Sequence, residues 1–253
     1  MAGACRVLPR GLKGLRFGPS SQFGNVFSAL SGVSIRANAV RIERENRYGA
    51  GGERRVRDVS KIVAVENLSL DGVMQAPGRA DEDPRGGFAH GGWAAPYNDQ
   101  VKGQVMGKGM AQAGPLLFGR KTYEDFFKVW PHRKDNPFTD VLDNTQKYVA
   151  STTLTEPLPW KNSTLLAGDT LDAIARLKEQ PGKDIVVLGS GVLVQSLMRR
   201  GLVDEFVLLI HPLVLGSGRR LFADDGALAA LTLVEAQPTT TGVVIATYRT
   251  TRC

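Results

Sequence analysis

The sequence has almost no cysteine and no long hydrophobic run. Its 253 residues include two cysteines, Cys5 and Cys253, which lie at opposite ends of the chain. This placement argues against a structural disulfide, and the absence of a CxxC motif or a Cys/His cluster predicts that no metal is bound. No stretch of about 18 consecutive apolar residues occurs, so no membrane-spanning helix is predicted. The cysteine usage is typical of a reducing compartment or of a chain indifferent to redox, and we expect the cytoplasm.

Acidic residues are absent from the first 42 positions, which hold six basic residues and several serines and glycines. This composition is typical of an organelle transit peptide, and an unstructured extension is the alternative. Residues 41–61 are dense in charge and glycine, as in a linker. We therefore expect a basic leader and linker over residues 1–60 and a folded domain over residues 61–253. If the leader is a transit peptide, an organelle replaces the cytoplasm as the expected location.

The positive charge of the chain is confined to this leader. Residues 1–60 hold 11 Lys/Arg and four Asp/Glu, and this excess equals the net charge of +7 of the whole chain. The remaining residues are therefore neutral in sum, which predicts no basic face for nucleic acid. A nucleic-acid-binding role would rest on the leader alone.

Strand-like and helix-like segments alternate from residue 61 onward, and the chain ends on β-rich segments without a long helix between them. Such alternation predicts an α/β fold with a largely parallel central sheet covered on both faces, and the ending predicts an antiparallel edge. Strands are expected over 62–66, 115–118, 147–151, 164–167 and 184–188, helices over 97–113, 122–127, 170–179 and 191–200, and further β structure over 203–214, 231–235 and 242–248.

Three turns that suit phosphate groups follow predicted strands. They are Gly119-Arg120-Lys121-Thr122, the turn at Ser151-Thr152, and Gly189-Ser190-Gly191. Glycine lets a phosphate approach the backbone, a helix N-terminus supplies partial positive charge, and basic side chains supply full charge. However, Val194 occupies the third glycine position of a Rossmann fingerprint, and no Walker motif occurs. Each turn taken singly is therefore equally compatible with a tight connection that binds nothing.

The order of these segments resembles the dihydrofolate-reductase-like family. The matching stretches are "LSLDGVM", "LLFGRKTYE", "VAST" and "IVVLGSGVLVQSLMRRGLVDEFVLLIHPLVLGSGRRLF", and together they span about residues 61–250. They are most similar to the branch that contains the reductase domain of riboflavin biosynthesis. The HxE and PCxxC motifs of the zinc deaminase found in the bifunctional riboflavin enzyme are absent, so the chain resembles the stand-alone members. The resemblance implies a three-layer fold with NADPH bound across the carboxyl edge of its sheet.

The resemblance also implies roles for the residues of the turns. Gly189, Ser190 and Gly191 would contact the pyrophosphate of NADPH, and Gly119, Arg120, Lys121 and Thr122 would bind the other side of the phosphates. Ser151 and Thr152 would lie near the adenosine ribose and its 2′-phosphate, a contact that selects NADP over NAD. Residues 69–72, including Gly72, would lie beside the nicotinamide ring.

The substrate side is less defined. In the loop "HGGWAAPY", His90, Trp93 and Tyr97 are the expected substrate contacts because aromatic faces suit a heteroaromatic ring, although Trp93 also suits core packing. Asp71 and Glu124 are candidate proton donors, with a simple turn and an exposed helix face as their alternatives, and water is a third source.

Three further basic residues and one histidine complete the predictions for this side. Arg79, Arg85 and Arg133 are unplaced candidates for a contact with a substrate phosphate. His211 precedes a proline in an apolar strand, and we expect it to be structural.

The sequence therefore predicts an NADPH-dependent reductase of a small heteroaromatic molecule, most similar to 5-amino-6-(5-phosphoribosylamino)uracil reductase. A dihydrofolate or pterin reductase and a non-catalytic NADP(H)-binding protein are the alternatives. The expected partners are a small-molecule substrate and a second copy of the chain, joined through the apolar late strands. No nucleic acid or membrane is expected.

Overall fold

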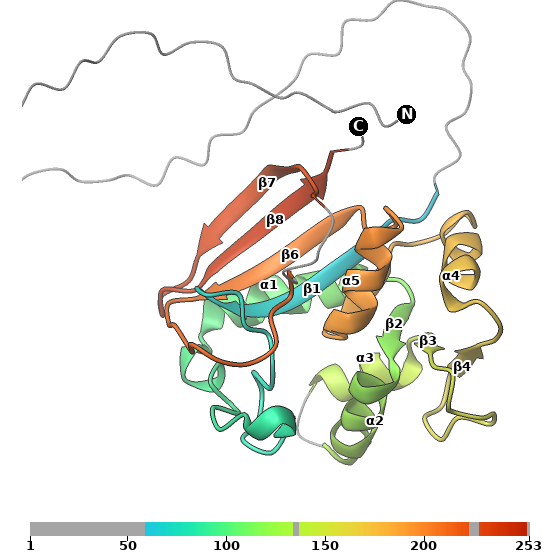
Figure 1. The fold of residues 1–253 in the computed structure, drawn as a ribbon, viewed down its shortest axis with the longest axis horizontal. Helices are drawn as coiled ribbons and strands as arrows, with labels where there is room; N and C mark the ends of the chain where they lie inside the picture. Colours follow the sequence, from blue (N-terminus) through green and yellow to red (C-terminus); the bar gives the residue numbers. More distant parts are fainter. Residues whose placement is uncertain (1–58, 134–136, 223–227, 252–253) are drawn as a thin grey trace, which may run out of the picture. The chain divides into compact units, whose positions relative to one another are not determined.

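The computed structural model describes residues 59–133, 137–222 and 228–251 (Figure 1). The predicted leader, apart from its last two residues, lies outside the described residues, as do Cys5 and Cys253. Within the described residues, one sheet of eight strands forms the centre of the fold.

The strands follow the order β4-β3-β2-β5-β1-β6-β8-β7 across the sheet. The first six are parallel, whereas β8 and β7 are antiparallel, which confirms the predicted parallel sheet with an antiparallel C-terminal edge. Their bounds are β1 Ile62–Ser69, β2 Leu116–Gly119, β3 Lys147–Ala150, β4 Ser163–Leu166, β5 Ile185–Leu188, β6 Glu205–His211, β7 Leu231–Pro238 and β8 Val244–Thr250.

Helices cover the two faces of the sheet. The α-helices are α1 Gln100–Gln112, α2 Arg120–Val129, α3 Pro137–Asn144, α4 Thr170–Lys178 and α5 Gly191–Arg199, and short 3-10 turns occur at Arg85–Gly87, Ala95–Tyr97 and Trp130–His132. Side chains of α4 and α5 pack with one set of strand residues, whereas side chains of α1, α2 and α3 pack with the alternate set. Figure 1 shows α5 and α1 on opposite sides of β1.

Local sequence explains where two of these helices begin. The carboxylate of Asp169 accepts hydrogen bonds from the N–H groups of Leu171 (3.0 Å) and Asp172 (3.1 Å), as expected of the N-cap of α4. Helix α1 begins three residues later than predicted because Asp99 caps it, accepting from Lys102 N–H at 2.7 Å. Helix α3 was not predicted, since it is short and its flanks show no periodic apolar pattern.

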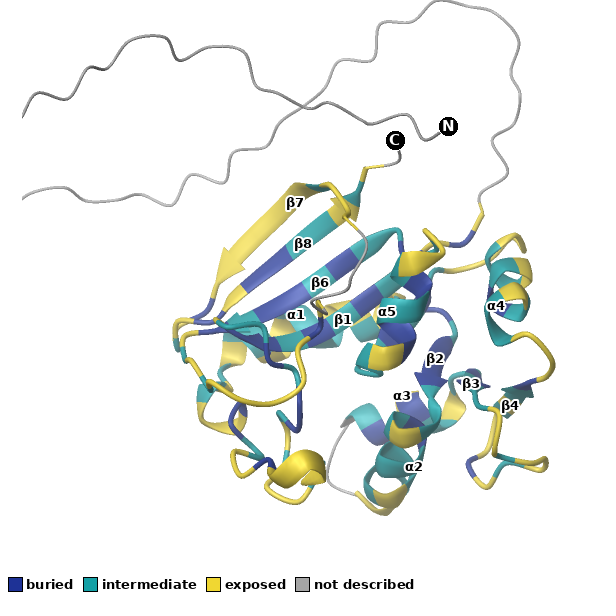
Figure 2. Ribbon diagram, viewed as in Figure 1, coloured by how far each residue is buried: buried dark blue, intermediate teal, exposed yellow. Residues whose placement is uncertain are grey.

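The central strands of the sheet are buried on both faces, whereas β7, at one side of the sheet, is exposed (Figure 2). Strand β1 lies between β5 and β6 and alternates buried and half-buried residues, so it receives helices on both sides. No described helix combines the length and the apolar character needed to cross a bilayer.

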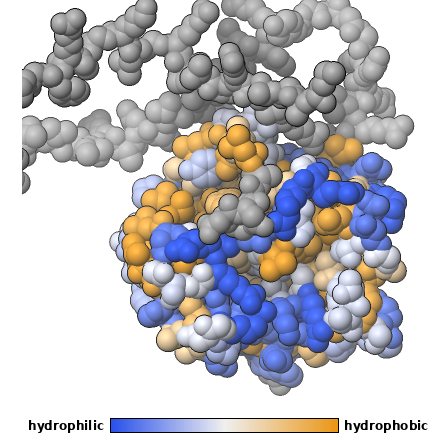
Figure 3. All heavy atoms as spheres, in the orientation of Figure 1, coloured by the Kyte–Doolittle hydropathy of each residue, from blue (hydrophilic) through white to orange (hydrophobic). Residues whose placement is uncertain are grey.

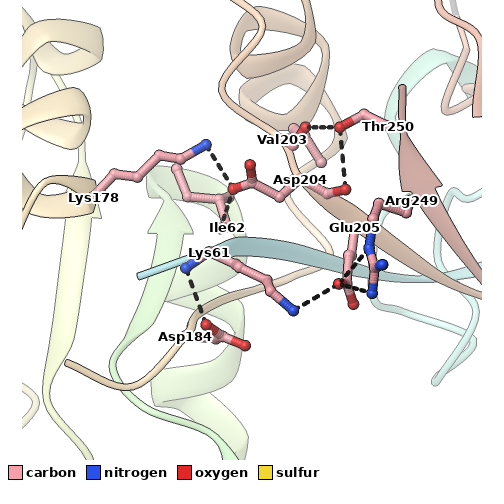
Figure 4. A network of polar contacts seen from close by, with 9 residues as sticks. All are labelled: Lys61, Ile62, Lys178, Asp184, Val203, Asp204, Glu205, Arg249 and Thr250. Atoms are coloured by element: carbon pink, nitrogen blue, oxygen red, sulfur yellow. Dashed lines mark hydrogen bonds and ion pairs between the residues drawn. The ribbon is translucent and has the colours of Figure 1, made fainter. Parts of the chain in front are cut away.

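A polar network fixes the amino ends of the strands (Figure 4). The carboxylate of Asp204 accepts from Ile62 N–H at 2.9 Å and forms an ion pair with Lys178 at 2.6 Å, while Lys61 pairs with Glu205 at 2.8 Å. These contacts join the starts of β1 and β6 to α4. These contacts occupy the amino ends of the strands. The turns at the opposite, carboxyl ends of the strands are therefore the ones available to a ligand.

Candidate functional site

The carboxyl ends of four neighbouring parallel strands bring the predicted turns together. In the strand order β3-β2-β5-β1, these ends lead into Ser151, Arg120, Gly189 and the turn at 70–72, respectively. Turns separated by up to about half the chain therefore line one edge of the sheet, where α/β folds bind their ligands.

The turns after β2 and β5 are joined by a direct hydrogen bond. Ser190 Oγ accepts from the N–H of Gly119 at 3.0 Å. Gly189 and Ser190 both have positive φ, 61° and 65°, a conformation that costs a non-glycine residue about 1 kcal/mol or more. The serine hydroxyl thus holds the end of β2 instead of capping its own helix.

The N-terminus of α5 presents free N–H groups at this junction. The N–H groups of Leu193 and Val194 bond to the carbonyl of Ser190, whereas those of Gly191 and Val192 have no acceptor among the described residues. Unpaired N–H groups and the positive end of the helix dipole together suit an anion. A Cβ at position 191 would collide with the sulfur of Met74, so a larger residue there would require the Met74 side chain to move.

Arg120 connects the turn after β2 with the turn after β3. Its Nη1 donates to Thr153 Oγ1 at 2.5 Å and its Nε donates to Glu124 Oε1 at 2.8 Å. Its side chain stays 40% exposed, and that of Lys121 stays 62% exposed. Both cations can therefore meet a phosphate from solvent. The methyl group of Thr122 lies against Gly189 and completes the contact between β2 and β5.

The turn after β3 is organised by its serine. Ser151 Oγ accepts from the N–H groups of Thr153 and Leu154, each at 3.1 Å. Thr152 is exposed, and within the described residues no hydrogen bond holds its side chain. The exposed Thr152 is therefore the more available hydroxyl of the two.

Asp71 ties two loops together. Its carboxylate accepts from Ser69 Oγ at 2.6 Å and from the N–H groups of Leu215 (3.1 Å) and Gly216 (2.9 Å). These donors, the Ser69 hydroxyl first, lower the pKa of Asp71 to about 2. The adjacent Gly72 has φ 80°, which the tight turn requires. An ionised carboxylate has no proton to deliver at neutral pH, so the predicted role of Asp71 as proton donor does not suit this geometry.

The second predicted proton donor is also engaged. Glu124 receives Arg120 at 2.8 Å and Lys121 at 3.7 Å, both from its own helix. Its side chain positions the two cations of the turn. The structure thus gives Glu124 a role beside the predicted phosphate contacts and shows no arrangement that favours proton transfer.

Two of the three predicted substrate contacts meet around a histidine. Trp93 is 7% exposed, donates from Nε1 to the carbonyl of Gln75 at 2.7 Å, and packs edge-on against His211 with ring centroids 5.1 Å apart. Tyr97, half-buried, packs edge-on on the same ring at 5.6 Å. His90 lies apart from this group and contacts Phe88. Tyr97 is therefore the more accessible aromatic face.

His211 itself is buried and neutral, which fits the structural role expected for it. Burial, and then the charge of Lys102, lower its pKa to about 4. Its Nδ1 lies 2.9 Å from the carbonyl oxygen of Leu209, and its Nε2 lies 3.3 Å from Nζ of Lys102. A carbonyl oxygen can only accept a hydrogen bond, so Nδ1 must carry the proton and donate to Leu209. The unprotonated Nε2 then accepts a hydrogen bond from the ammonium of Lys102.

Two further charged residues near the site, Lys102 and Glu66, were not predicted from the sequence. Lys102 is half-buried on α1, and burial lowers its pKa. Glu66 is buried in the middle of β1, one of its carboxylate oxygens has no partner among the described groups, and burial raises its pKa well above the usual range. A carboxylate inside the apolar run "IVAVENLS" is a readable signal. The lysine gives no comparable signal in a polar, glycine-containing helix.

A scan of protein families matches residues 60–245 to the RibD C-terminal domain. The chain belongs to that family. Two proteins of Bacillus subtilis (strain 168), both named as uncharacterized, are similar: YyaP is 35% identical over 143 residues, 54% of this chain and 74% of YyaP, and YwjB is 44% identical over 48 residues, 19% of this chain and 28% of YwjB. Membership of this family indicates a reductase of the RibD C-terminal type.

Two solved structures share the fold. A putative riboflavin biosynthesis protein from Shewanella sp. PV-4 has a TM-score of 0.54 at 22% identity, covering 76% of this chain and 99% of that one. A pyrimidine reductase-like protein from Corynebacterium diphtheriae has a TM-score of 0.50 at 13% identity, covering 77% and 93%. At these identities the similarity establishes the dihydrofolate-reductase-like architecture alone. Among the described residues, no group of three or more His, Cys, Asp or Glu side chains is arranged to hold a metal ion.

Proposed function

We propose that this protein is an NADPH-dependent reductase of a small heteroaromatic substrate, of the 5-amino-6-(5-phosphoribosylamino)uracil reductase type. One observation carries the proposal: the turns after β2, β3 and β5 adjoin one another through the Ser190–Gly119 and Arg120–Thr153 hydrogen bonds. Anion-binding groups on adjacent strand ends suit a ligand with several phosphates, and family membership favours a pyridine dinucleotide.

The residues present fit such a cofactor. The free N–H groups of Gly191 and Val192 would hold the pyrophosphate, with Arg120 and Lys121 supplying positive charge on its other side. Thr152 would meet the 2′-phosphate that distinguishes NADPH from NADH. Bound NADPH would supply a hydride to a C=N or C=O bond of the substrate.

The accompanying proton is assigned to Lys102. Asp71 and Glu124 are both held by other groups, whereas the ammonium of Lys102 uses one of its three donors on His211 and has no acceptor for the other two among the described residues. Through His211 it adjoins Trp93 and Tyr97. Burial lowers the pKa of Lys102, which makes its proton easier to transfer. The buried ring of His211 contacts the ammonium at 3.3 Å and would orient the lysine.

A non-catalytic NADP(H)-binding protein is the second candidate. It is favoured by the engagement of both predicted carboxylate donors in other contacts. Steady oxidation of NADPH with any substrate would remove it. Tight NADPH binding without turnover over a broad panel of substrates would support it instead.

The first test is a titration of the full chain with NADPH and with NADH, followed by tryptophan fluorescence. Saturable quenching that favours NADPH is expected, and Arg120→Gln should weaken it about tenfold because one charge-assisted contact is lost. Arg199→Gln is the control, since Arg199 is exposed and forms no ion pair within the described residues. Absence of binding of either dinucleotide would contradict the proposal.

The second test concerns the proton. Turnover is measured as NADPH oxidation with 5-amino-6-(5-phosphoribosylamino)uracil and with dihydrofolate. Lys102→Met should lower turnover about 100-fold while leaving NADPH affinity unchanged, because general acid catalysis contributes about that factor. Unchanged turnover in this variant would reassign the proton to water.

A further inference from the structure

A small cavity lies where two loops at the carboxyl edge meet, outside the three phosphate-binding turns. Its volume is about 270 Å³ and its walls are Gln75, the segment 85–88 and the segment 217–219. A pocket for a whole small-molecule ligand is usually about 300–1,000 Å³, so this cavity is the size of a subsite for one chemical group. The wall formed by Gln75 and residues 85–88 belongs to the segment between β1 and α1, which also carries Trp93, the predicted substrate contact.

A buried side chain holds the two walls in place. Gln75 is 5% exposed, and its Nε2 donates to the carbonyls of Asp83 (3.0 Å) and Arg85 (2.9 Å). Its Oε1 accepts the N–H of Arg219 at 3.0 Å, across 144 residues of sequence. The side-chain amide of Gln75 thus forms hydrogen bonds with both loops. These bonds hold the cavity between the loops open without a ligand.

Close packing also fixes the second wall. Gly218 has φ 113°, and a Cβ at this position would lie 2.7 Å from both Phe88 and Val73. Only glycine allows this approach. The N–H groups of Ser217 and Gly218 donate to no acceptor within the described part of the chain. The wall therefore presents unpaired donors beside the cavity.

The charges around the cavity do not cancel. Arg85 is matched by Asp83, whose carboxylate accepts from Nε at 2.6 Å and from Nη2 at 2.5 Å. Arg219 forms no ion pair with any described residue, although its charge contributes to lowering the pKa of Asp83. The exposed guanidinium of Arg219 thus has no direct ion-pair partner among the described residues and lies in the same loop as the unpaired N–H groups, a combination that binds phosphate and carboxylate groups.

The other two arginines that the sequence left unplaced are engaged elsewhere. Arg79 forms a two-armed contact with Asp125 of α2, at 2.5 and 3.3 Å. Arg133 stacks on the ring of Trp130, with its guanidinium carbon 5.2 Å from the centroid. Of the three, only Arg85 lines the cavity, and it does so together with Arg219, which was not among the predicted phosphate contacts.

We propose that this cavity is an anion subsite, in which Arg219 and the N–H groups of Ser217 and Gly218 hold a phosphate monoester or carboxylate of the substrate. The assignment to the substrate rests on the proposed function, because the loop that forms one wall also carries Trp93 and Tyr97. The affinity of the cavity for an anion is a property of the fold and does not depend on reductase activity.

The test is a titration of the ¹⁵N-labelled full chain with inorganic phosphate at constant ionic strength, followed by amide chemical shifts. The N–H signals of Ser217 and Gly218 should shift saturably, with a dissociation constant of about 1–10 mM for so small an anion. The N–H signals of Gly191 and Val192 report separately on the proposed pyrophosphate site. Saturation at 191–192 without a change at 217–218 would overturn the proposal.

Arg219→Gln should weaken the shifts at 217–218 about tenfold and leave those at 191–192 unchanged, since one charge-assisted contact is lost. Arg199→Gln, which removes an exposed charge elsewhere, should change neither. Equal phosphate affinity in the wild type and in Arg219→Gln would also overturn the subsite.

NADPH binding separates this proposal from the proposed function. If NADPH does not bind but phosphate still shifts 217–218, the subsite stands and the reductase assignment fails. If NADPH binds and displaces phosphate from 217–218, the anion belongs to the cofactor and the assignment to the substrate is overturned.

Discussion

At the scale of single residues, polar groups at the carboxyl edge divide into those that hold loops together and those that remain open. Asp71 and Ser190 have their acceptor oxygens filled by N–H or O–H donors of neighbouring loops. The side chains of Lys102 and Arg219 keep donors that have no acceptor in the described part of the chain. Cations therefore remain available at this edge while its carboxylates are used in the fold, which favours an anionic or electron-rich ligand.

His211 makes stability depend on pH. Its pKa is about 4 in the folded state and about 6.5 in an unfolded chain, so the unfolded state takes up the proton first as the pH falls. Protonation therefore favours unfolding, and between pH 6.5 and 4 the wild type should lose up to about 3 kcal/mol that His211→Gln does not lose. Urea unfolding at a series of pH values measures the difference.

The matched control for this prediction is His132→Gln, because His132 is exposed at the end of the 3-10 turn Trp130–His132. That variant should retain the full pH dependence of the wild type. If the slope between pH 6.5 and 4 is the same in His211→Gln as in the wild type, the buried imidazole is not its source.

At the scale of elements, the glycines of two helices differ in what surrounds them. Gly103 in α1 has open space around its Cα, whereas Gly191 at the start of α5 faces the sulfur of Met74. Neither has positive φ, so the difference lies in packing and not in backbone conformation. The glycines of α1 weaken a helix, while Gly191 makes room for the turn of residues 69–74.

Gly103→Ala should stabilise the protein by about 0.5–1 kcal/mol, because alanine loses less conformational freedom than glycine when a helix forms. Urea unfolding should show a higher midpoint at an unchanged slope. An unchanged or lower midpoint would mean that α1 contributes nothing to the cooperative unit.

Gly191→Ala should destabilise by about 1–3 kcal/mol, because the added methyl group overpacks against Met74. The penalty should shrink in a Met74→Ala background, and this coupling is measured by a double-mutant cycle. Additive effects of the two changes would show that the collision is relieved by other movements.

At the scale of the whole domain, one end of the sheet is left bare. Strand β7 is exposed along nearly its whole length, with Leu233 52% and Val234 49% exposed, and a bulge between Leu233 and Glu235 interrupts its pairing with β8. Figure 3 shows hydrophobic surface over the region of β7 and β8. Exposed apolar side chains on a final strand are a usual sign of an interface.

We therefore propose that the chain forms a homodimer through the exposed face of β7 and β8. Sedimentation velocity should give a dimer for the wild type and a monomer for Leu233→Glu, because the introduced carboxylate would be desolvated in the interface. Val214→Glu is the control, since Val214 is 69% exposed in the segment after β6 and belongs to neither β7 nor β8. A monomeric wild type would remove the proposal.

The amino-acid sequence by itself determined the order of strands and helices, the parallel sheet with its antiparallel edge, and the turns after β2, β3 and β5. These features follow from apolar periodicity, caps such as Asp169 and glycines at strand ends, all of which act over a few residues. The short α3 escaped prediction because tertiary packing of Leu142, and not a local pattern, stabilises it.

Only the tertiary structure decided which side chains are free to act. It engaged Asp71 and Glu124, buried Trp93, placed the ammonium of Lys102 on His211, and bonded the backbone N–H of Arg219 to Gln75, the last two contacts across 109 and 144 residues of sequence. The availability of a donor depends on every group within a few ångströms of it, and those groups come from segments far apart in the chain. A single sequence specifies such neighbours only through the complete fold.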